Sequence, residues 1–270
     1  GQITFEMAMN YVDDFVTVST DEICSAIKKI YEEFRVVLEP AGALSLAGLL
    51  KYCAEHKLTG KKLVCISSGA NMNFQRLQFV AERTLTGEGK EALYAIRLEE
   101  YPGTLNEFCN RGLKDKSITE FNYRINSPTE AHIFLGIAIN DEKDKTGFEA
   151  GLKKSGYEFT DLTGNELAKL HVRHMVGGVS PHAVNEKIYR VEFPERPQAL
   201  GEFLQLISGR WNISLFHYRN HGTDFGRVLI GLQIPETDSK HFQEFLLNNK
   251  YHFREESDNT AYALFLKKKM

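Results

Sequence analysis

The sequence of 270 residues predicts an α/β segment followed by two tandem α+β modules of ferredoxin-like order. Two observations carry this prediction. In the first part of the chain, helical patterns surround one apolar run that ends in a glycine-containing turn, as in open α/β sheets. In the remainder, strand and helix patterns alternate over short distances, and the sequence matches itself at a fixed shift of 95 residues.

Composition places the chain among ordinary globular proteins: 42% of residues are hydrophobic, 26% are charged and the net charge is −3. This charge gives no reason to expect nucleic acid or a membrane surface as partner. The four cysteines have no CxxC spacing, so neither a disulfide framework nor a zinc site is predicted. No apolar stretch reaches the ~18 residues of a membrane span. No signal peptide is predicted, and we expect a cytoplasmic location.

The first part of the chain predicts four helices, over residues 5–12, 20–34, 40–52 and 74–83. Thr20 is a capping residue for the second. Pro40 occupies the first turn of the third, where a missing N–H costs nothing. The many Ala, Gly and Leu residues of that helix predict burial on most sides. Residues 62–67 form an apolar run typical of a short buried strand, followed by a turn.

Residues 86–90 resemble a linker, and the repeat begins after it. The shift of 95 superposes identical residues without a gap, including Tyr94 on Tyr189, Glu100 on Glu195, Pro102 on Pro197, Phe121 on Phe216, Arg124 on Arg219 and Gly136 on Gly231. Later the shift becomes 94, with Phe148 on Phe242 and Tyr157 on Tyr251. One register held for so long indicates a duplicated module.

In the first copy, strands are predicted near residues 94–98, 119–124 and 131–139, with helices near 104–111 and 148–155. This is the order of a split βαβ, ferredoxin-like fold. Residues 171–182 join the copies. The predicted domains are residues 1–88, 89–176 and 177–270.

Ser68 and Glu39 are the polar residues of the first part that suit a ligand site. Ser68 follows the predicted strand and precedes Gly69, so its hydroxyl can bond a heterocycle nitrogen or a phosphate in a crevice. An ordinary helix N-cap is the alternative. Glu39 places a carboxylate at a helix N-terminus, where the helix dipole alone already favours an acid.

Each copy carries a Tyr-Arg pair at the end of the strand after its first helix: Tyr123 with Arg124, and Tyr218 with Arg219. An arginine can hold a carboxylate through two hydrogen bonds, and a tyrosine offers an apolar face and one hydroxyl. The loops before Leu105 and Leu200 lead into helix N-termini, which favour anions. The combination suits a small amino acid. The alternative is that repeated residues simply maintain a repeated fold.

The histidines do not predict a metal site. His171 and His174 are three residues apart, and His217 and His221 are four apart, but no third ligand of the right type stands nearby. A serine or cysteine hydrolase is also unsupported, because the sequence has no GxSxG and no hydrolase motif around a cysteine.

Two groups of motifs resemble the biosynthetic threonine deaminase (threonine ammonia-lyase) family. Residues 37–44 (VLEPAGAL) and 68–74 (SGANMNF) are similar to the end of its catalytic domain. Three stretches are similar to its regulatory domain: 119–124 (TEFNYR), 169–178 (KLHVRHMVGG) and 211–219 (WNISLFHYR). The similarity covers essentially the whole chain.

The resemblance implies part of a fold-type II α/β catalytic domain that uses pyridoxal phosphate, followed by two ACT-like subdomains. It implies conversion of L-threonine to 2-oxobutanoate and ammonia, the committed step to isoleucine. Isoleucine is the implied inhibitor, valine the implied antagonist, and a homotetramer the implied assembly of the complete enzyme.

By position, the resemblance assigns Ser68 to the pyridine nitrogen of the cofactor and Glu39 to its neighbourhood. A neutral hydroxyl leaves that nitrogen largely unprotonated, so the ring is a moderate electron sink suited to β-elimination. Tyr123 and Tyr218 match effector-site positions. A further set matches positions associated with feedback control: Arg124, Arg219, Leu105, Leu200 and Lys116.

The resemblance places the Schiff-base lysine and the phosphate-binding loop in a segment before these 270 residues, so we expect the chain alone to turn over no threonine. Two functions therefore stay open, part of an allosteric lyase or a stand-alone amino-acid-binding module. An RNA-binding module is disfavoured by the acidic charge and the lack of an RRM aromatic motif. The copies differ at three aligned pairs that we expect to matter: Asn122 and His217, Lys116 and Trp211, Gly103 and Gln198.

Overall fold

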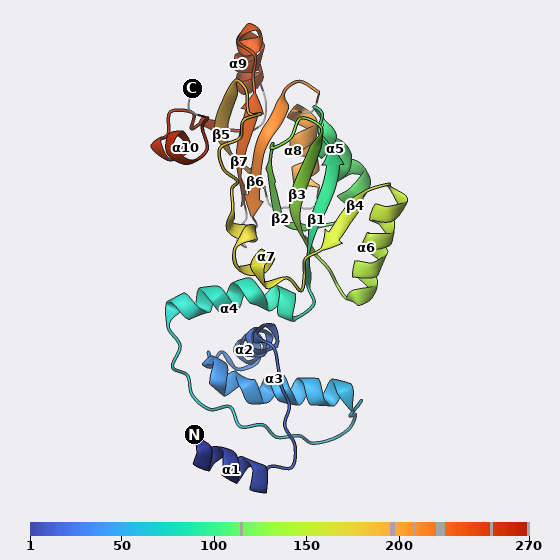
Figure 1. Ribbon diagram of the computed structural model, residues 1–270, viewed down its shortest axis with the longest axis vertical. Helices are drawn as coiled ribbons and strands as arrows, with labels where there is room; N and C mark the ends of the chain where they lie inside the picture. The colour runs from blue at the N-terminus through green and yellow to red at the C-terminus, as the bar shows by residue number, and fades with distance from the viewer. Residues whose placement is uncertain (114–115, 195–197, 208, 220–224, 249–250, 269–270) are drawn as a thin grey trace. The chain divides into compact units, whose positions relative to one another are not determined.

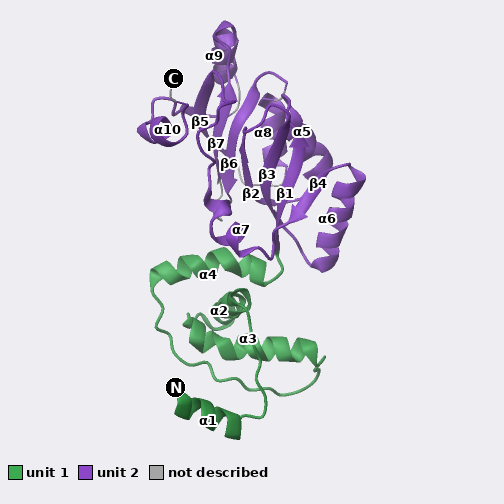
Figure 2. Ribbon diagram, viewed as in Figure 1, with its two compact units in different colours: residues 1–90 green, residues 91–270 purple. Residues whose placement is uncertain are grey.

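The computed structural model describes residues 1–113, 116–194, 198–207, 209–219, 225–248 and 251–268. Contacts divide the chain into unit 1, residues 1–90, and unit 2, residues 91–270 (Figure 2). Glu195, Pro197 and His221, which the sequence analysis singled out, lie outside the described residues. Among the described helices, none has the length and apolar character needed to cross a membrane.

Unit 1 consists of four helices (Figure 1): α1 Gln2–Tyr11, α2 Thr20–Phe34, α3 Pro40–Glu55 and α4 Phe74–Gly87. The Ser19 hydroxyl accepts the Glu22 N–H at 3.2 Å while the Glu22 carboxylate accepts the Ser19 N–H at 2.6 Å. This capping box starts α2, so Ser19 rather than Thr20 is its cap. A small core packs α2 against α3 and α4, and its buried members are Cys24, Ala26, Ile27, Ile30, Leu38, Ala43, Ala47 and Val80.

The four predicted helices of unit 1 are confirmed, but the predicted strand at residues 62–67 is wrong. That segment has no regular secondary structure, and Val64 and Ile66 are 90% and 80% exposed. A strand needs a neighbouring strand for its N–H and C=O groups, and residues 1–90, all of them described, contain no strand. The predicted burial of α3 is also wrong, since it buries only Gly42, Ala43 and Ala47.

Unit 2 is built on one eight-stranded antiparallel sheet of order β4-β1-β3-β2-β6-β7-β5-β8 (Figure 1). Its strands are β1 Glu91–Glu99, β2 Ile118–Arg124, β3 Glu130–Ala138, β4 Glu158–Asp161, β5 Glu186–Pro194, β6 Asn212–Arg219, β7 Phe225–Gln233 and β8 Phe253–Glu255. Its α-helices are α5 Thr104–Phe108, α6 Glu142–Lys154, α7 Glu166–Leu170, α8 Ala199–Ile207, α9 Ser239–Asn248 and α10 Thr260–Phe265. A π-helical turn, Cys109–Leu113, extends α5, and 3-10 turns cover Val172–His174 and Glu236–Asp238.

The duplication predicted from the sequence is confirmed in the strand register. In the first copy Leu93 pairs with Gly136, and in the second Ile188 pairs with Gly231, each 95 residues later. Four strands in the order 4-1-3-2 with crossing helices make each half ferredoxin-like. The predicted tandem α+β fold is therefore correct.

The two copies meet where β2 pairs with β6, and Asn122 lies opposite His217. These two positions are themselves 95 residues apart. They therefore mark a local twofold axis between the copies. One apolar core runs through both copies on one face of the sheet, and Phe121 meets Phe216 across the axis edge to face, with ring centroids 5.5 Å apart.

The opposite face of the sheet, called the far face below, is covered by shorter segments. Alternation along β1 separates the two faces: Tyr94 and Ile96 belong to the main core, and Leu93 packs on the far face against Ala168 of α7. The sequence analysis did not predict α7 or α10. Their five and six residues are too few for a helical period to be recognised.

Candidate functional site

Glu39 and Ser68, singled out separately in the sequence, lie together at the start of α3. The Glu39 N–H donates to the Gly69 carbonyl at 3.3 Å. A Cβ on Gly42 would lie 1.9 Å from the Ser68 carbonyl oxygen, so only glycine permits this close approach. Gly69 has φ +75°, and a Cβ added to it would lie 2.2 Å from Glu39 Oε1. The turn is thus held by backbone contacts, and the Ser68 side chain is exposed.

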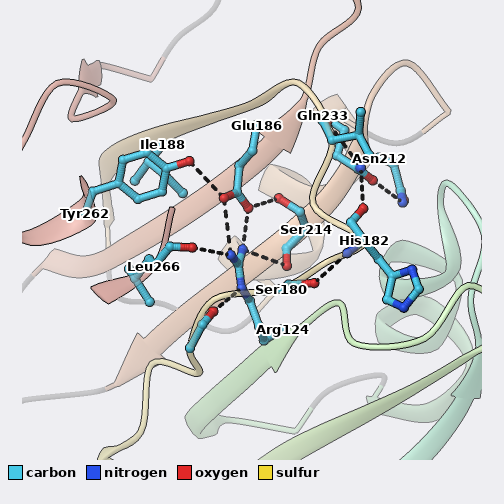
Figure 3. Close-up of polar contacts among 12 residues, drawn as sticks. Arg124, Ser180, His182, Glu186, Ile188, Asn212, Ser214, Gln233, Tyr262 and Leu266 are labelled. Carbon is cyan, nitrogen blue, oxygen red and sulfur yellow. Dashed lines mark hydrogen bonds and ion pairs between the residues drawn. The ribbon is translucent and has the colours of Figure 1, made fainter. Parts of the chain in front are cut away.

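Arg124 lies at the end of β2 and joins several segments of unit 2 (Figure 3). Its guanidinium forms an ion pair with Glu186 of β5, and the two side chains are 9% and 4% exposed. Its Nε donates to the Gly178 carbonyl at 2.9 Å, and its Nη2 donates to the Leu266 carbonyl at 3.0 Å. The Tyr262 hydroxyl and the Ser214 hydroxyl donate to the same glutamate.

The equivalent glutamate of the first copy, Glu91, pairs with an arginine that is not the repeat partner of Arg124. Arg173, in the segment after α7, lies 3.3 Å from Glu91 and donates from Nε to Glu120 at 3.1 Å. Arg219, the repeat partner of Arg124, lies 3.7 Å from Glu120 and 3.0 Å from the His174 ring. The Thr119 hydroxyl donates to Glu91 at 2.6 Å, as Ser214 does to Glu186 in the second copy.

Glu120 is the most unusual titrating group of this cluster. Its side chain is fully buried, and burial raises the pKa of its carboxyl from 4.5 to about 7, although the Arg173 and Arg219 charges oppose the shift. One of its oxygens is buried without a hydrogen-bond partner. The sequence alone did not predict a buried carboxyl with a raised pKa in β2, the strand through which the two copies pair.

The two tyrosines of the Tyr-Arg pairs point away from the arginines, into the main core. The Tyr123 hydroxyl donates to Glu100 at 2.5 Å, and the Tyr218 hydroxyl donates to the Ile118 carbonyl at 3.4 Å. Burial raises the pKa of the Tyr123 phenol far above its ordinary value, so the hydroxyl stays a donor. Tyr and Arg of each pair thus serve opposite faces of one sheet.

Leu105 and Leu200 are buried in the same core as the tyrosines, at the first turns of α5 and α8. Lys116 is separate from them and forms an ion pair with Asp144 in the first turn of α6. Trp211, the repeat partner of Lys116, makes the equivalent contact, since its Nε1 donates to Asp238 at 2.5 Å.

The structure therefore divides the predicted effector residues into three places. The tyrosines and leucines share the core beside α5 and α8, the arginines lie in ion-pair clusters on the far face, and Lys116 fixes the start of α6. Among the described residues, no group of three or more histidine, cysteine, aspartate or glutamate side chains could hold a metal ion.

A cavity of about 510 Å³ on the far face of the second copy was not anticipated from the sequence. Its walls come from β5, β7, α10 and residues 174–177 of the segment that joins the copies. The Arg124 cluster lies beside it, because the Leu266 carbonyl that Arg124 binds belongs to the cavity wall. The sequence signal that could have revealed it is the set of positions where the second copy departs from the first.

Two family models match the chain. The C-terminal regulatory domain of threonine dehydratase matches residues 82–172 and again residues 177–266. The pyridoxal-phosphate dependent enzyme model matches residues 1–69. The matched regions follow one another along the chain and cover most of it.

Curated relatives are similar over nearly the whole chain. The biosynthetic L-threonine dehydratase IlvA of Burkholderia multivorans is 46% identical over 98% of this chain and 52% of the relative. The Escherichia coli protein of that name is 43% identical, with the same two coverages. The mitochondrial threonine dehydratase of Saccharomyces cerevisiae is 45% identical over 99% of this chain and 48% of the relative. The chain spans about half the length of these relatives, and it belongs to the threonine dehydratase family, whose C-terminal regulatory domain it contains.

Proposed function

We propose that this chain is the regulatory half of a lyase that converts L-threonine to 2-oxobutanoate and ammonia. Its two ACT-like copies bind isoleucine as inhibitor and valine as antagonist. The observation that carries the proposal is the match of both copies to the regulatory domain of threonine dehydratase, preceded by a match to pyridoxal-phosphate dependent enzymes.

The turn at Ser68 fits a cofactor contact in the complete enzyme. Pyridoxal phosphate, when bound, supplies an electron sink for α-deprotonation and β-elimination. With the cofactor bound, the Ser68 hydroxyl would donate a hydrogen bond to the pyridine nitrogen, and Glu39 would position the turn through its close approach to Gly69. Support comes from the exposed Ser68 side chain and from the glycine contacts that fix its backbone.

The Schiff-base lysine is proposed to lie in sequence outside these 270 residues, so the chain alone has no turnover. Mixing the chain with pyridoxal phosphate and L-threonine tests this. We expect no Schiff-base absorbance band and no formation of 2-oxobutanoate. Threonine-dependent 2-oxobutanoate formed by this chain alone would contradict the proposal.

Tyr123 and Tyr218 are proposed to support effector control, together with Leu105 and Leu200 in the same core. In the complete enzyme, Tyr123→Phe removes the hydroxyl that binds Glu100 and keeps the ring, and we expect it to weaken isoleucine inhibition. Tyr101→Phe is the matched control, because that tyrosine also donates to a glutamate but is 40% exposed. Inhibition curves unchanged by Tyr123→Phe, Tyr123→Ala and Tyr218→Ala would exclude the assignment.

A stand-alone amino-acid-binding module is the second candidate, favoured by the self-contained core of unit 2. It differs from the first in one measurable respect. If the chain is a regulatory half, isoleucine binding changes the rate of threonine turnover in the complete enzyme. If it is a stand-alone module, isoleucine binds and no threonine turnover changes. We also propose that the complete enzyme is a cytoplasmic homotetramer. Native mass measurement tests the number of subunits.

A further inference from the structure

Each copy in unit 2 ends in a short helix on the far face, α7 in the first copy and α10 in the second. Equivalent hydrogen bonds hold both. The Leu93 N–H donates to Thr163 Oγ1 at 3.0 Å, and the Ile188 N–H donates to Ser257 Oγ at 3.1 Å. The asparagines Asn165 and Asn259 cap the two helices. The copies can therefore be compared residue by residue, at shifts of 95 in the strands and 94 near the helices.

In the first copy, the space between the short helix and the sheet is filled. Leu93, Phe134 and Ala168 are 0%, 8% and 2% exposed, and Leu162 and Val172 pack against them. These five apolar side chains form a closed cluster separate from the main core. The fold thus permits this space to be packed without a ligand.

In the second copy, the same space is open. The equivalents of the five cluster residues are Ile188, Leu229, Tyr262, Glu256 and Leu266, and all of them line the 510 Å³ cavity. Leu229 is smaller than the Phe134 that it replaces. The Tyr262 hydroxyl donates to Glu186 at 3.0 Å (Figure 3), so this side chain is directed toward the Arg124 cluster. Duplicated segments with the same hydrogen bonds therefore enclose a packed cluster in one copy and a cavity in the other.

The open copy also carries charges where the closed copy has none. Arg190 stands at the position of Ala95, and Glu256 at the position of Leu162. Arg190 Nε lies 2.6 Å from Glu256 Oε1, and the two side chains are 54% and 14% exposed. A guanidinium has five N–H donors and a carboxylate has about four acceptor positions. Glu256 also accepts from Asn259 Nδ2 at 2.7 Å and lies 3.5 Å from Arg254 Nε. Donors of Arg190 and acceptor positions of Glu256 remain for a further charged partner at the mouth of the cavity.

We propose that this cavity binds a free α-amino acid with a branched aliphatic side chain. Arg190 holds the carboxylate, Glu256 accepts from the ammonium group, and the aliphatic chain lies against Ile188, Leu229 and Leu266. Adjacent opposite charges beside an apolar space of this size match a zwitterion with an apolar side chain. The proposal rests on the proposed effector function and gives it a site distinct from Tyr123 and Tyr218.

The walls of this cavity are bonded to two arginines that the resemblance associates with feedback control. Arg124 donates to the carbonyls of Leu266 and Gly178, which lie in the cavity wall and next to it. Arg219 contacts the ring of His174, another wall residue. Arg124 and Glu186 also connect this region to the first copy through β2. A ligand in the cavity would therefore contact wall segments that are bonded to arginines of both copies.

Calorimetric titration of the whole chain with L-isoleucine tests the proposal. Arg190→Ala installs the residue of the first copy, and we expect it to weaken binding about tenfold or more, the factor that corresponds to about 1.4 kcal/mol. Leu229→Phe installs the Phe134 side chain, fills the cavity and is expected to weaken binding as well. The matched control is Arg227→Ala, which removes an exposed arginine of β7 that pairs at 3.4 Å with Glu192 of β5 and does not line the cavity. It should leave the affinity unchanged.

Thermal unfolding of each variant shows that it is folded, so a loss of affinity can be interpreted. If isoleucine binds the wild-type chain and binds Arg190→Ala and Leu229→Phe equally well, the cavity is not the site, although the effector function stands. If no branched-chain amino acid binds the wild-type chain, the effector function itself fails, and the cavity assignment fails with it.

Discussion

Arg124 is a buried guanidinium whose partners come from four separate parts of unit 2. It pairs with Glu186 and donates to the carbonyls of Gly178, Ser214 and Leu266. The sequence predicts an arginine suited to a carboxylate, and the structure supplies a carboxylate from the neighbouring copy. Which carboxylate it meets depends on how two distant strands pair, and no local pattern contains that information.

Replacing Arg124 by alanine leaves Glu186 as a buried charge without its cation. Breaking one partner of a buried ion pair costs about 3–5 kcal/mol. We expect Arg124→Ala to lower the free energy of unfolding by that amount in a denaturant titration. Arg97→Ala is the control, because Arg97 also pairs with two glutamates but is half exposed, and it should change stability little. Equal effects of the two substitutions would contradict the structural role of the Arg124 pair.

Glu120 predicts a specific pH dependence of stability. Because its folded pKa of about 7 lies above the ordinary 4.5, the folded chain holds a proton that the unfolded chain releases in this interval. The stabilising contribution is full below about pH 4.5 and is lost as the pH rises through about 7. Its magnitude is about 1–3 kcal/mol.

Glu120→Gln removes this titration and keeps the shape of the side chain. We expect the difference in unfolding free energy between about pH 5 and pH 8 to be smaller in Glu120→Gln than in the wild-type chain. Parallel urea titrations at the two pH values measure it. A wild-type pH dependence retained in the variant would assign the effect to other groups.

At the scale of elements, the paired glycines of β3 and β7 show how the repeat works. Gly136 lies under the Thr119 hydroxyl, and Gly231 lies under the Ser214 hydroxyl and the Glu186 carboxylate. A Cβ on Gly231 would lie 2.7 Å from Ser214 Oγ and 2.8 Å from Glu186 Oε1. The glycine thus makes room for the side chains that connect adjacent strands.

Gly231→Ala should force these side chains apart and cost about 1–3 kcal/mol of stability, as overpacking does elsewhere. Gly147→Ala is the control, because Gly147 lies in α6 with nothing within 4 Å of an added Cβ. Alanine at a helical glycine with free space stabilises by about 0.4–1 kcal/mol. Thermal unfolding distinguishes the two, and a neutral Gly231→Ala would show that Glu186 and Ser214 are not fixed as described.

The sequence predicts the elements of unit 2 better than those of unit 1. Alternating strands and a 95-residue repeat carry their own signal, since the pattern is local and occurs twice. The strand predicted at residues 62–67 was wrong because a strand forms only with a partner strand, which residues 1–90 do not contain. The cavity was not predicted either, because the positions where the copies differ do not by themselves show how the short helices pack against the equivalent strands.

At the scale of the whole molecule, the two units differ in how they bury apolar surface. The main core of unit 2 lies entirely within residues 91–270. In unit 1, several large apolar side chains are at least two-thirds exposed: Ile3, Tyr11, Val64, Ile66 and Phe74. Apolar side chains that stay exposed are available to bind a hydrophobic dye.

This difference predicts that residues 91–270 fold without unit 1. We expect the fragment to unfold in one cooperative thermal transition and to bind less of a hydrophobic dye than the whole chain does. It should also keep the isoleucine affinity of the whole chain. A fragment without a cooperative transition would show that unit 2 needs unit 1 to fold.

The central claim is that the duplicated half of this chain is an amino-acid-binding regulatory module of a threonine dehydratase. Calorimetric titration of the whole chain with L-isoleucine tests it most directly. We predict saturable binding, competition by L-valine, and a loss of affinity in Arg190→Ala but not in Arg227→Ala. The absence of saturable binding to millimolar isoleucine, in a chain shown to be folded, would contradict it.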